Sequence, residues 1–540
     1  MITFTPTPQQ QAAIDYDGSM VITACPGSGK TTVMKEKIRK ITPRLPDHKG
    51  VIAITFTKKA SQELKKRCKH NAHDTKQSFF GTIDSFCLKE LILPFISRVW
   101  GGNPTECKVV KQLQNPYLFF LDEEYFSPTV ENILNDDGFK RLYDAGFLWM
   151  NSFAALALYI LNESSAAERY IKAKYSHVFI DEYQDSSESQ HQLFKKLLML
   201  GLTATAVGDT SQSIYEFRGG NPELLNTLVD DSDNFSHFEI NINHRCHDSI
   251  VNYASRLLEP SFQLIQCEHK HIFRRLITGN LTNAAQQISD WISNWIKKSE
   301  WKITKASDIA ILAKKEKSLR LLTTGLDVNY RIYSDNPLDE VGTDCSELYS
   351  HLLAFKYGAI STIQELIENQ FELVVLKEKN LASIRKTIRA LREVEEVEQL
   401  IEKFHELASR LGMDETEASD TAVRTILQQE ELIKQFMPLD DNEVQVMTLH
   451  KSKGLEFKVV FHFDLEEWSF PFKQVINNDW DNPIYPSLSQ DTNLHYVGIT
   501  RAENCCVLIR TTLRQNSHGN FSQSAPSYFL GLPQLEGLYG

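Results

Sequence analysis

Short apolar runs recur along this chain, and each gives way to small or polar residues. Met20–Thr23, Val51–Ile54 and Val178–Ile180 have the length of a buried strand and are too short for a stable helix. The first two lead into stretches with a helical pattern of apolar positions. Apolar strands followed by helices predict an α/β fold, and ligands of open α/β sheets bind at the carboxyl ends of the strands.

The same pattern returns in the second half of the chain and predicts a second α/β unit. Its strand-like runs lie at 308–315, 444–449, 459–463 and 506–509. Residues from about 89 to 174 are rich in aromatic side chains, with a helical pattern from about 138 to 170, and we expect an inserted small domain there. Residues 345–435 are almost continuously helical in pattern, and their basic side fits a solvated helix face or a DNA surface.

Composition limits the class of protein. The formal charge is 58 − 70 = −12, which by itself argues weakly against a nucleic-acid partner, although a bound polyanion responds to a local groove more than to the whole chain. Nine cysteines without a C-x-x-C pair are typical of a reducing compartment. Because no apolar run approaches about 18 residues and no signal peptide opens the chain, we expect a cytoplasmic, membrane-free protein.

The strongest candidate site follows the first apolar run. The segment from Ala24 to Thr32 reads ACPGSGKTT and precedes a helical pattern. A small-residue loop between a strand and a helix lets backbone N–H groups converge on phosphate oxygens, and the helix N-terminus adds positive potential. Lys30 can reach the β- and γ-phosphates, and the Thr31 hydroxyl can hold Mg²⁺. The predicted phosphate cradle consists of Pro26, Gly27, Ser28, Gly29, Lys30, Thr31 and Thr32.

A second motif supports a nucleotide site. The run ending at Ile180 is followed at once by Asp181 and Glu182. Adjacent acids at a sheet edge can divide the work of hydrolysis, with Asp181 holding Mg²⁺ and Glu182 polarising the attacking water. Gln10, upstream of the first run, can offer a donor and an acceptor to an adenine edge, but a plain N-terminal helix explains it equally well.

Other strand ends suggest contacts with nucleic acid. Residues 51–57 predict a strand ending in Thr55, Phe56 and Thr57, and the run at 204–208 leads to Phe217 and Arg218. Aromatic platforms beside a cation suit stacking on single-stranded bases. A strand-like run from Phe238 delivers Arg245, which could stabilise charge on a transferring phosphoryl group or form a structural ion pair.

Taken in order, these motifs resemble the superfamily 1A DNA helicases of the UvrD/Rep/PcrA type. The most specific strings are ACPGSGKTT, ITFTKKASQEL, IDEYQDSS, VGDTSQSIYEFRG, MTLHKSKGLEF and YVGITRAE. The resemblance implies two RecA-like P-loop NTPase domains with helical insertions, ATP and Mg²⁺ as cofactors, and 3′-to-5′ movement on single-stranded DNA. The implied domains are 1A at 1–88 and 175–246, 1B at 89–174, 2A at 247–340 and 436–540, and 2B at 341–435.

The resemblance also assigns roles to residues. It implies that Gln10 reads adenine, Gln212 senses the γ-phosphate, and Glu456 contacts ribose. Arg245 and Arg501 would be arginine fingers, joining Lys30, Asp181 and Glu182 in catalysis. His244 stands where the family usually has an adenine-stacking tyrosine, so looser base selectivity is expected. Phe217 stands where tryptophan is common, and Asp84 where histidine is usual. The implied DNA contacts are Thr55, Phe56, Thr57, Phe217, Arg218, Thr448 and His450.

The inserted segments are short for this family. Such compactness is similar to the helicase-like subunits of Gabija anti-phage systems, which work with an OLD-family ATPase-nuclease (GajA-like) partner. A stand-alone DNA repair helicase is the alternative within the family. A third possibility is an NTPase that senses single-stranded or end-containing DNA without processive unwinding. A non-catalytic scaffold is disfavoured because Lys30, Asp181, Glu182, Arg245 and Arg501 are all present.

Overall fold

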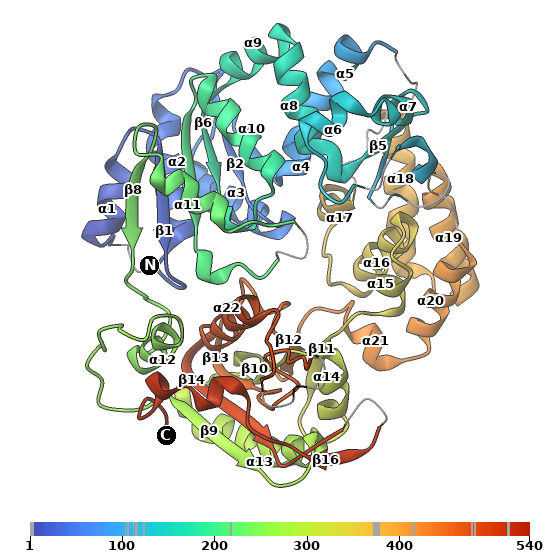
Figure 1. Ribbon diagram of the computed structural model, residues 1–540. Helices are drawn as coiled ribbons and strands as arrows, with labels where there is room; N and C mark the ends of the chain where they lie inside the picture. The colour runs from blue at the N-terminus through green and yellow to red at the C-terminus, as the bar shows by residue number, and fades with distance from the viewer. Residues whose placement is uncertain are drawn as a thin grey trace. The chain divides into compact units, whose positions relative to one another are not determined.

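The computed structural model describes residues 5–102, 104, 107–111, 113, 117–122, 125–215, 219–370, 378–411, 413, 416–476, 479, 482–515 and 519–540. Its internal contacts divide the chain into two compact units, each considered by itself (Figure 1). Unit 1 comprises Met1–Ile242, Val341–Phe355 and Ile360–Asp420, and unit 2 comprises Asn243–Glu340, Lys356–Ala359 and Thr421–Gly540.

Unit 1 is built around a parallel sheet. The described residues form six strands in the order β3-β2-β6-β7-β1-β8, and every neighbouring pair is parallel. The carboxyl ends of the strands therefore share one edge, where Ala24, Ile54, Ile180 and Gly208 each end a strand. The strands are β1 Met20–Ala24, β2 Gly50–Ile54, β3 Phe79–Gly81, β6 Tyr175–Ile180, β7 Thr203–Gly208 and β8 Ser236–Ile240.

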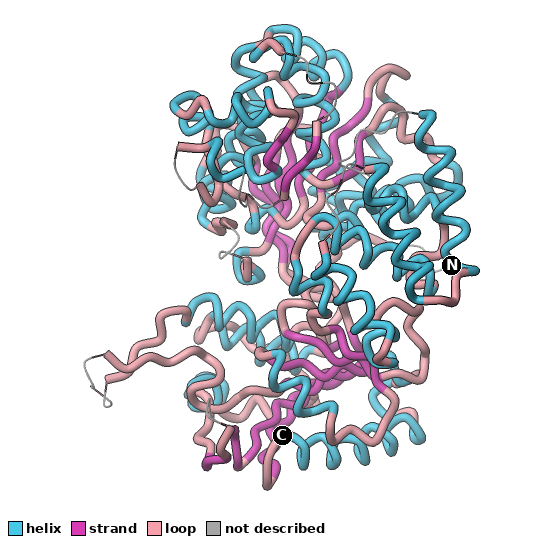
Figure 2. Tube along the Cα trace, turned by 90° about the vertical axis from the view of Figure 1, so that its right-hand side faces the viewer, coloured by secondary structure: helices cyan, strands magenta, loops and turns pink. Residues whose placement is uncertain are grey.

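Helices bury both faces of this sheet, as Figure 2 shows by the cyan helices on either side of the magenta strands. Val51 and Ala53 of β2 pack with α2 (Lys30–Ile41) and α3 (Lys58–Lys69), whereas Ile52 and Ile54 face the opposite core. The opposite core includes α8 (Phe153–Glu163), α10 (Glu188–Met199) and α11 (Glu223–Asp230). Burial on both faces explains why these strands read as apolar runs without alternation. The remaining helices of the first hundred residues are α1 Pro8–Asp15, α4 Ile83–Phe86 and α5 Leu93–Trp100, and the last of these lies within the expected insertion.

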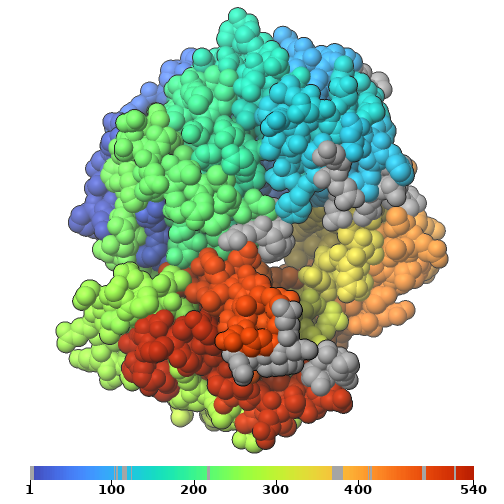
Figure 3. Space-filling view, in the orientation of Figure 1, coloured from blue at the N-terminus to red at the C-terminus, as the bar shows by residue number. Residues whose placement is uncertain are grey.

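The aromatic-rich segment shares a hydrophobic core with the sheet. Phe139, Trp149 and Phe153 belong to the same buried cluster as Ile52 and Val178 of the strands. In the space-filling view, the light-blue and teal residues of this segment continue the green surface of unit 1 (Figure 3). Phe147–Trp149 forms strand β5, paired with β4 (Lys108–Val110), inside the stretch with a helical pattern. Its helices are α6 Val130–Asn135, α7 Gly138–Asp144, α8 Phe153–Glu163 and α9 Ser165–Lys174, followed after β6 by α10 Glu188–Met199 and, after β7, α11 Glu223–Asp230.

The predicted helical insertion is helical in the structure, and most of it clusters with unit 1. An ion pair between Lys111 and Glu347 joins it to the aromatic-rich segment. The Arg392 guanidinium lies 4.3 Å from the centroid of the Phe355 ring, so two helical segments of the insertion pack against each other. The helices are α16 Asp344–Tyr357, α17 Ile363–Gln370, α18 Glu378–Ala390, α19 Val397–Arg410, α20 Glu417–Leu427 and α21 Glu430–Lys434.

Unit 2 contains the second parallel sheet, with described strands in the order β11-β12-β10-β13-β14-β9. Helices α13 and α14 pack on one face, and α12 and α22 contact β14 and β13. The strands are β9 Ile272–Ile277, β10 Ile309–Ala313, β11 Tyr330–Tyr333, β12 Val444–Thr448, β13 Phe457–His462 and β14 Ala502–Thr511, followed by the hairpin β15 Leu513–Gln515 and β16 Phe521–Gln523. The helices are α12 Asp248–Leu258, α13 Leu281–Lys298, α14 Glu316–Thr323, α15 Pro337–Val341 and α22 Leu488–Ile499.

The strand ends refine two expectations. β2 ends at Ile54, so the expected strand does not extend through Thr55, Phe56 and Thr57, which form the turn into α3. β8 ends at Ile240, and Arg245 therefore lies beyond the strand, in unit 2. No helix in the described part of the chain is long and apolar enough to cross a bilayer.

Candidate functional site

The loop between β1 and α2 has the backbone shape of a phosphate cradle. Gly27 and Gly29 have φ of 68° and 82°, a left-handed conformation that glycine adopts without a Cβ clash. The Lys30 side chain is 9% exposed, and its Nζ donates to the Ala24 carbonyl at 3.3 Å. A buried ammonium at the start of α2 places a cation beside the helix N-terminus, where anions are favoured.

Gln10 is attached to this loop. Its Nε2 donates to the Ser28 carbonyl at 2.8 Å, and its Oε1 accepts from the backbone N–H of Thr7 at 2.9 Å in the cap of α1. A Cβ added at Gly29 would lie 3.0 Å from Gln10 Nε2. Gln10 therefore lies against the cradle, and its side-chain amide links α1 to the loop. The adenine contact stays a prediction.

Thr31 and Asp181 come together from positions 150 residues apart in the chain. The Thr31 hydroxyl donates to the Asp181 carboxylate at 3.3 Å. A hydroxyl and a carboxylate are hard oxygen donors of the kind Mg²⁺ binds beside phosphates. Burial, followed by the neighbouring Glu182 carboxylate, raises the pKa of Asp181 to about 6. A bound divalent cation would hold this carboxylate ionised, so the residues present fit Mg²⁺.

Glu182 belongs to a chain of hydrogen bonds at the sheet edge. Gln184, which is fully buried, donates through Nε2 to the Glu182 carboxylate at 2.5 Å and accepts through Oε1 from the Asp209 N–H at 3.0 Å. Asp209 in turn accepts from Gln212 Nε2 at 2.6 Å. The chain connects the predicted water-activating acid with the predicted γ-phosphate sensor. It also assigns a position to Gln184 and Asp209, which the sequence motifs did not single out.

Three predicted residues from distant positions lie together in unit 2. Arg245 Nε donates to the Glu456 carboxylate at 2.9 Å, and Asn243 Oδ1 accepts from the Arg245 N–H at 2.8 Å. Arg501 is 1% exposed and donates to the carbonyls of Val497 at 3.0 Å and Leu455 at 3.1 Å. Leu455, whose carbonyl binds Arg501, directly precedes Glu456 in the chain, and strand β13 begins at the next residue, Phe457. His244, next to Arg245, is exposed.

The turn after β2 carries an aromatic pair. The rings of Phe56 and Tyr215 stack at a centroid distance of 5.1 Å and an interplanar angle of 14°. Phe56 is 40% exposed, so this stack is accessible from solvent. Tyr215 was not among the predicted DNA contacts; its position three residues after Gln212 was the available signal. Stacked exposed rings beside a turn are suited to stacking on bases.

The other predicted DNA contacts have less in common. Thr55 is buried and donates to the Thr57 carbonyl at 3.0 Å, while Thr57 caps α3 by accepting from the Ala60 N–H at 3.2 Å. Thr448 ends β12 and His450 follows in the next turn, both in unit 2. Phe217 and Arg218 lie outside the described residues. The DNA roles of all these residues stay predictions.

Comparison with known protein families settles the class. A model of the UvrD/REP helicase N-terminal domain matches residues 6–97 and 121–233, and a model of the UvrD-like helicase C-terminal domain matches residues 346–512. The chain belongs to the UvrD-like helicase family. Membership confirms the predicted fold with two RecA-like domains and the predicted enzyme class, an ATP-dependent DNA helicase.

Individual relatives cover nearly the whole chain. The chain is 27% identical to Gabija protein GajB of Bacillus cereus (strain VD045), over 93% of this chain and 94% of that protein. It is 24% identical to the ATP-dependent DNA helicase Rep of Buchnera aphidicola subsp. Schizaphis graminum, over 97% and 96%, respectively. It is 23% identical to the ATP-dependent DNA helicase PcrA of Staphylococcus aureus (strain MRSA252), over 97% and 85%.

Proposed function

We propose that this UvrD-like helicase hydrolyses ATP or another NTP in a Mg²⁺-dependent, DNA-stimulated reaction. The reaction would drive movement along single-stranded DNA, 3′ to 5′, or the sensing of DNA ends. The observation that carries the proposal is the convergence of Thr31 and Asp181 at 3.3 Å, with Lys30 and the Glu182–Gln184 pair at the same sheet edge. This arrangement supplies a phosphate cradle, hard oxygen ligands and a general base together.

The residues divide the chemistry between them. The N–H groups of the loop and the Lys30 ammonium bind the phosphate oxygens, and their attraction grows as charge develops on the transferring group. Glu182 orients the attacking water and accepts its proton, while Gln184 fixes the carboxylate. Thr31 and Asp181 would hold Mg²⁺, which would neutralise charge on the phosphate oxygens. Arg245 and Arg501 are the proposed arginine fingers, and Gln10, His244 and Glu456 are proposed to hold the base and ribose.

Two substitutions test the hydrolytic assignment. Lys30→Ala should lower kcat by orders of magnitude, because it removes phosphate contacts made mainly in the transition state. Glu182→Gln should retain nucleotide binding while hydrolysis stops. Lys40→Ala is a matched control on α2, where the lysine forms an exposed ion pair with Asp15. Near-normal turnover in Glu182→Gln would show that the general base has been assigned wrongly.

Strand displacement and hydrolysis can be separated. A helicase should displace a labelled strand from a 3′-tailed duplex in proportion to the ATP it hydrolyses. An end-sensing NTPase should show hydrolysis stimulated by DNA ends with little displacement. Comparing both rates on linear, tailed and circular single-stranded DNA distinguishes the two activities, and an absence of DNA stimulation on all three would contradict both.

We also propose that the protein is the helicase-like subunit of an anti-phage defence complex with an OLD-family ATPase-nuclease (GajA-like) as partner. The support is the similarity to Gabija protein GajB along 93% of the chain. A stand-alone repair helicase is the competing assignment, favoured by the similarity to Rep and PcrA. Affinity capture of the tagged chain from its native host, with mass spectrometry, should recover an ATPase-nuclease. Recovery of repair proteins alone would favour the competing role.

A further inference from the structure

Unit 2 contains a cavity that is separate from the residues assigned to nucleotide hydrolysis. Its volume is about 580 Å³, within the range of small-molecule sites. Four segments form it: the first turn of α13, the first turn of α14, the loop around Trp468, and the β15–β16 hairpin. The residues that face it include basic, hydroxyl and aromatic side chains, and these chemical types decide what it can bind.

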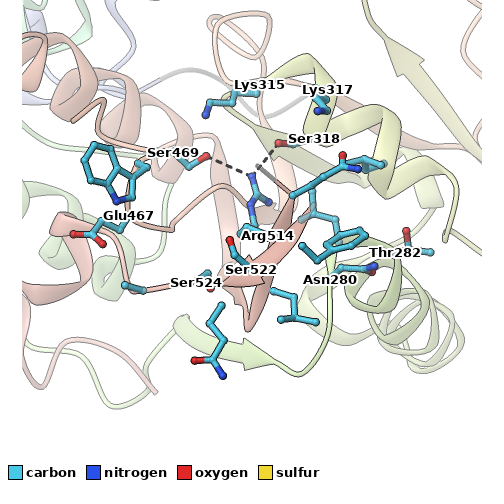
Figure 4. A pocket seen from close by; sticks show the side chains of 18 residues that line it. Asn280, Thr282, Lys315, Lys317, Ser318, Glu467, Ser469, Arg514, Ser522 and Ser524 are labelled. Atoms are coloured by element: carbon cyan, nitrogen blue, oxygen red, sulfur yellow. Dashed lines mark hydrogen bonds between the residues drawn. The ribbon is translucent and has the colours of Figure 1, made fainter. Parts of the chain in front are cut away.

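The basic side chains come from two elements. Lys315 and Lys317 lie at the start of α14, and Arg514 belongs to β15. Figure 4 shows Arg514 between Ser318 and Ser469, with the two lysines along one edge of the cavity. Arg514 Nη2 donates to the hydroxyl of Ser318 at 3.2 Å and of Ser469 at 3.4 Å. These bonds orient the guanidinium from several sides.

Buried acids beneath Arg514 do not cancel the positive charge of the lysines. Asp464 forms an ion pair with Arg514, and Glu466 lies 3.6 Å from its Nε. Burial raises the pKa of Glu466, and the nearby Arg514 guanidinium opposes this rise. Glu467, the acid that lines the cavity, forms an ion pair with Lys473 at 2.5 Å. The three basic side chains therefore outnumber the two buried acids, and the cavity keeps a net positive charge.

Aromatic side chains border the same space. Trp468 is 43% exposed and Phe521 is 51% exposed, and both line the cavity. Exposed aromatic rings offer a nucleobase a flat surface on which it can stack with little regard to its identity. Lys473 Nζ lies 4.7 Å from the centroid of the Trp468 ring, which adds a cation beside this surface. Ser522 and Ser524 also line the cavity; the Ser522 hydroxyl can bind a sugar or a phosphate, whereas the Ser524 hydroxyl already donates to the Thr511 carbonyl.

We propose that this cavity binds a nucleotide, with its phosphate near Lys315 and Lys317 and its base against Phe521 or Trp468. The ligand is a free mononucleotide or a nucleotide unit of a DNA strand, since both present a phosphate beside a base. The inference goes beyond the proposed function, because the cavity residues come from segments outside the phosphate cradle. A second nucleotide site would allow the helicase to respond to a nucleotide that it does not hydrolyse.

The experiment uses the full chain carrying Lys30→Ala, so that the phosphate cradle is weakened, and AMP as the probe. AMP lacks the β- and γ-phosphates on which a P-loop depends, which further separates the two sites. We expect saturable AMP binding by calorimetry. Lys317→Glu and Phe521→Ala, two substitutions of exposed side chains, should each weaken it about tenfold or more.

Matched controls are Lys297→Glu, at the far end of α13, and Leu276→Ala, an exposed apolar residue of β9. Neither lines the cavity, and neither should change AMP affinity. A parallel titration with a 5′-phosphorylated single-stranded oligonucleotide distinguishes the source. If the two cavity variants weaken only the oligonucleotide, the site takes a strand; if they weaken AMP, it takes a free nucleotide. If neither ligand loses affinity relative to the controls, the proposal is wrong, whether or not the chain hydrolyses ATP.

Discussion

The side-chain amide of Gln184 joins the Glu182 carboxylate, at 2.5 Å, to the backbone of Asp209, at 3.0 Å. A buried amide with both ends bonded has one favoured orientation, because rotating it would leave a donor or an acceptor unsatisfied. The orientation of Glu182 is therefore linked to the loop that begins at Asp209 and carries Gln212 and Tyr215. Glu182, the proposed general base, thus shares a chain of hydrogen bonds with the loop that carries Tyr215 of the aromatic pair.

Removing the Gln184 amide should reduce turnover more than nucleotide binding. Gln184→Leu should lower kcat on the order of 100-fold with little change in the Kd for nucleotide, because a small displacement of a reacting group has effects of this size. Gln184→Glu retains the acceptor for Asp209 but loses the donor, so it should also be slow. Gln192→Leu, which removes an exposed 2.6 Å bond to Glu188, is the control. Equal kcat values in Gln184→Leu and Gln192→Leu would refute the positioning role.

Asp181 should make the nucleotide-free protein less stable as the pH rises. Burial and Glu182 raise the pKa of Asp181 to about 6, above the ordinary value of 3.8. The folded state then binds more protons than the unfolded state between these values, and stability falls as pH rises through about 6. Asp181→Asn should remove this fall and increase the unfolding free energy at pH 8 by on the order of 1 kcal/mol. Denaturant titrations at pH 5 and pH 8 without Mg²⁺ measure it.

Asp181→Asn should also reduce the stabilisation that Mg²⁺ and nucleotide give to the folded state. Mg²⁺ and nucleotide stabilise the folded state only if they bind it, and Asp181→Asn removes a charged ligand. The melting temperature of the wild-type chain should therefore rise with Mg²⁺ and nucleotide, and that of Asp181→Asn should rise much less. A variant that gains as much as the wild type would exclude Asp181 as a metal ligand.

Arg245 and Glu456 form an ion pair whose value for stability is small. The Glu456 side chain is 58% exposed, and solvent screens such a pair to roughly 0–1 kcal/mol. Arg245→Ala should therefore change the unfolding free energy little while lowering kcat by about 10³-fold or more, as expected for an arginine finger. Arg245→Lys should not restore activity, because the ammonium lacks the planar fork. A loss of stability that accounts for the loss of activity would favour a purely structural pair.

The aromatic pair should contribute to DNA binding. Tyr215→Ala and Phe56→Ala should each weaken single-stranded DNA binding by about 1–3 kcal/mol, the range for a stacked base. Affinity should also fall steeply with salt despite the net charge of −12, because phosphate contacts release counterions. Fluorescence anisotropy at several salt concentrations measures both effects. Phe119→Ala, an 80% exposed phenylalanine elsewhere in unit 1, is the control, and variants no weaker than it would exclude the pair as a stacking site.

The predictable features of this site are local in sequence. Lys30, Thr31 and Asp181 could be assigned because each follows an apolar run, and the ends of parallel strands meet at one edge. Gln184 could not, because its role depends on where Asp209 lies after folding. Strand β5 falls in a stretch with a helical pattern because three apolar residues fit either period. The sharing of one core by Trp149 and Val178 likewise arises only from tertiary packing.

His244 should make base selection looser than in relatives with tyrosine at this position. The imidazole is exposed, offers less apolar area than a phenol ring, and competes less well with water for a stacked adenine. Gln10 can still read the base edge, but one neutral hydrogen bond supplies about 1 kcal/mol, and its amide also bonds the Ser28 carbonyl. Values of kcat/KM for GTP, dATP and dGTP should thus lie within roughly tenfold of that for ATP.

His244→Tyr should shift the preference toward ATP when DNA is saturating. The control is His247→Phe, because the native His247 ring stacks on His271, with the ring centroids 3.5 Å apart. A wild-type preference for ATP of about 100-fold, unchanged in His244→Tyr, would show that the base is selected elsewhere.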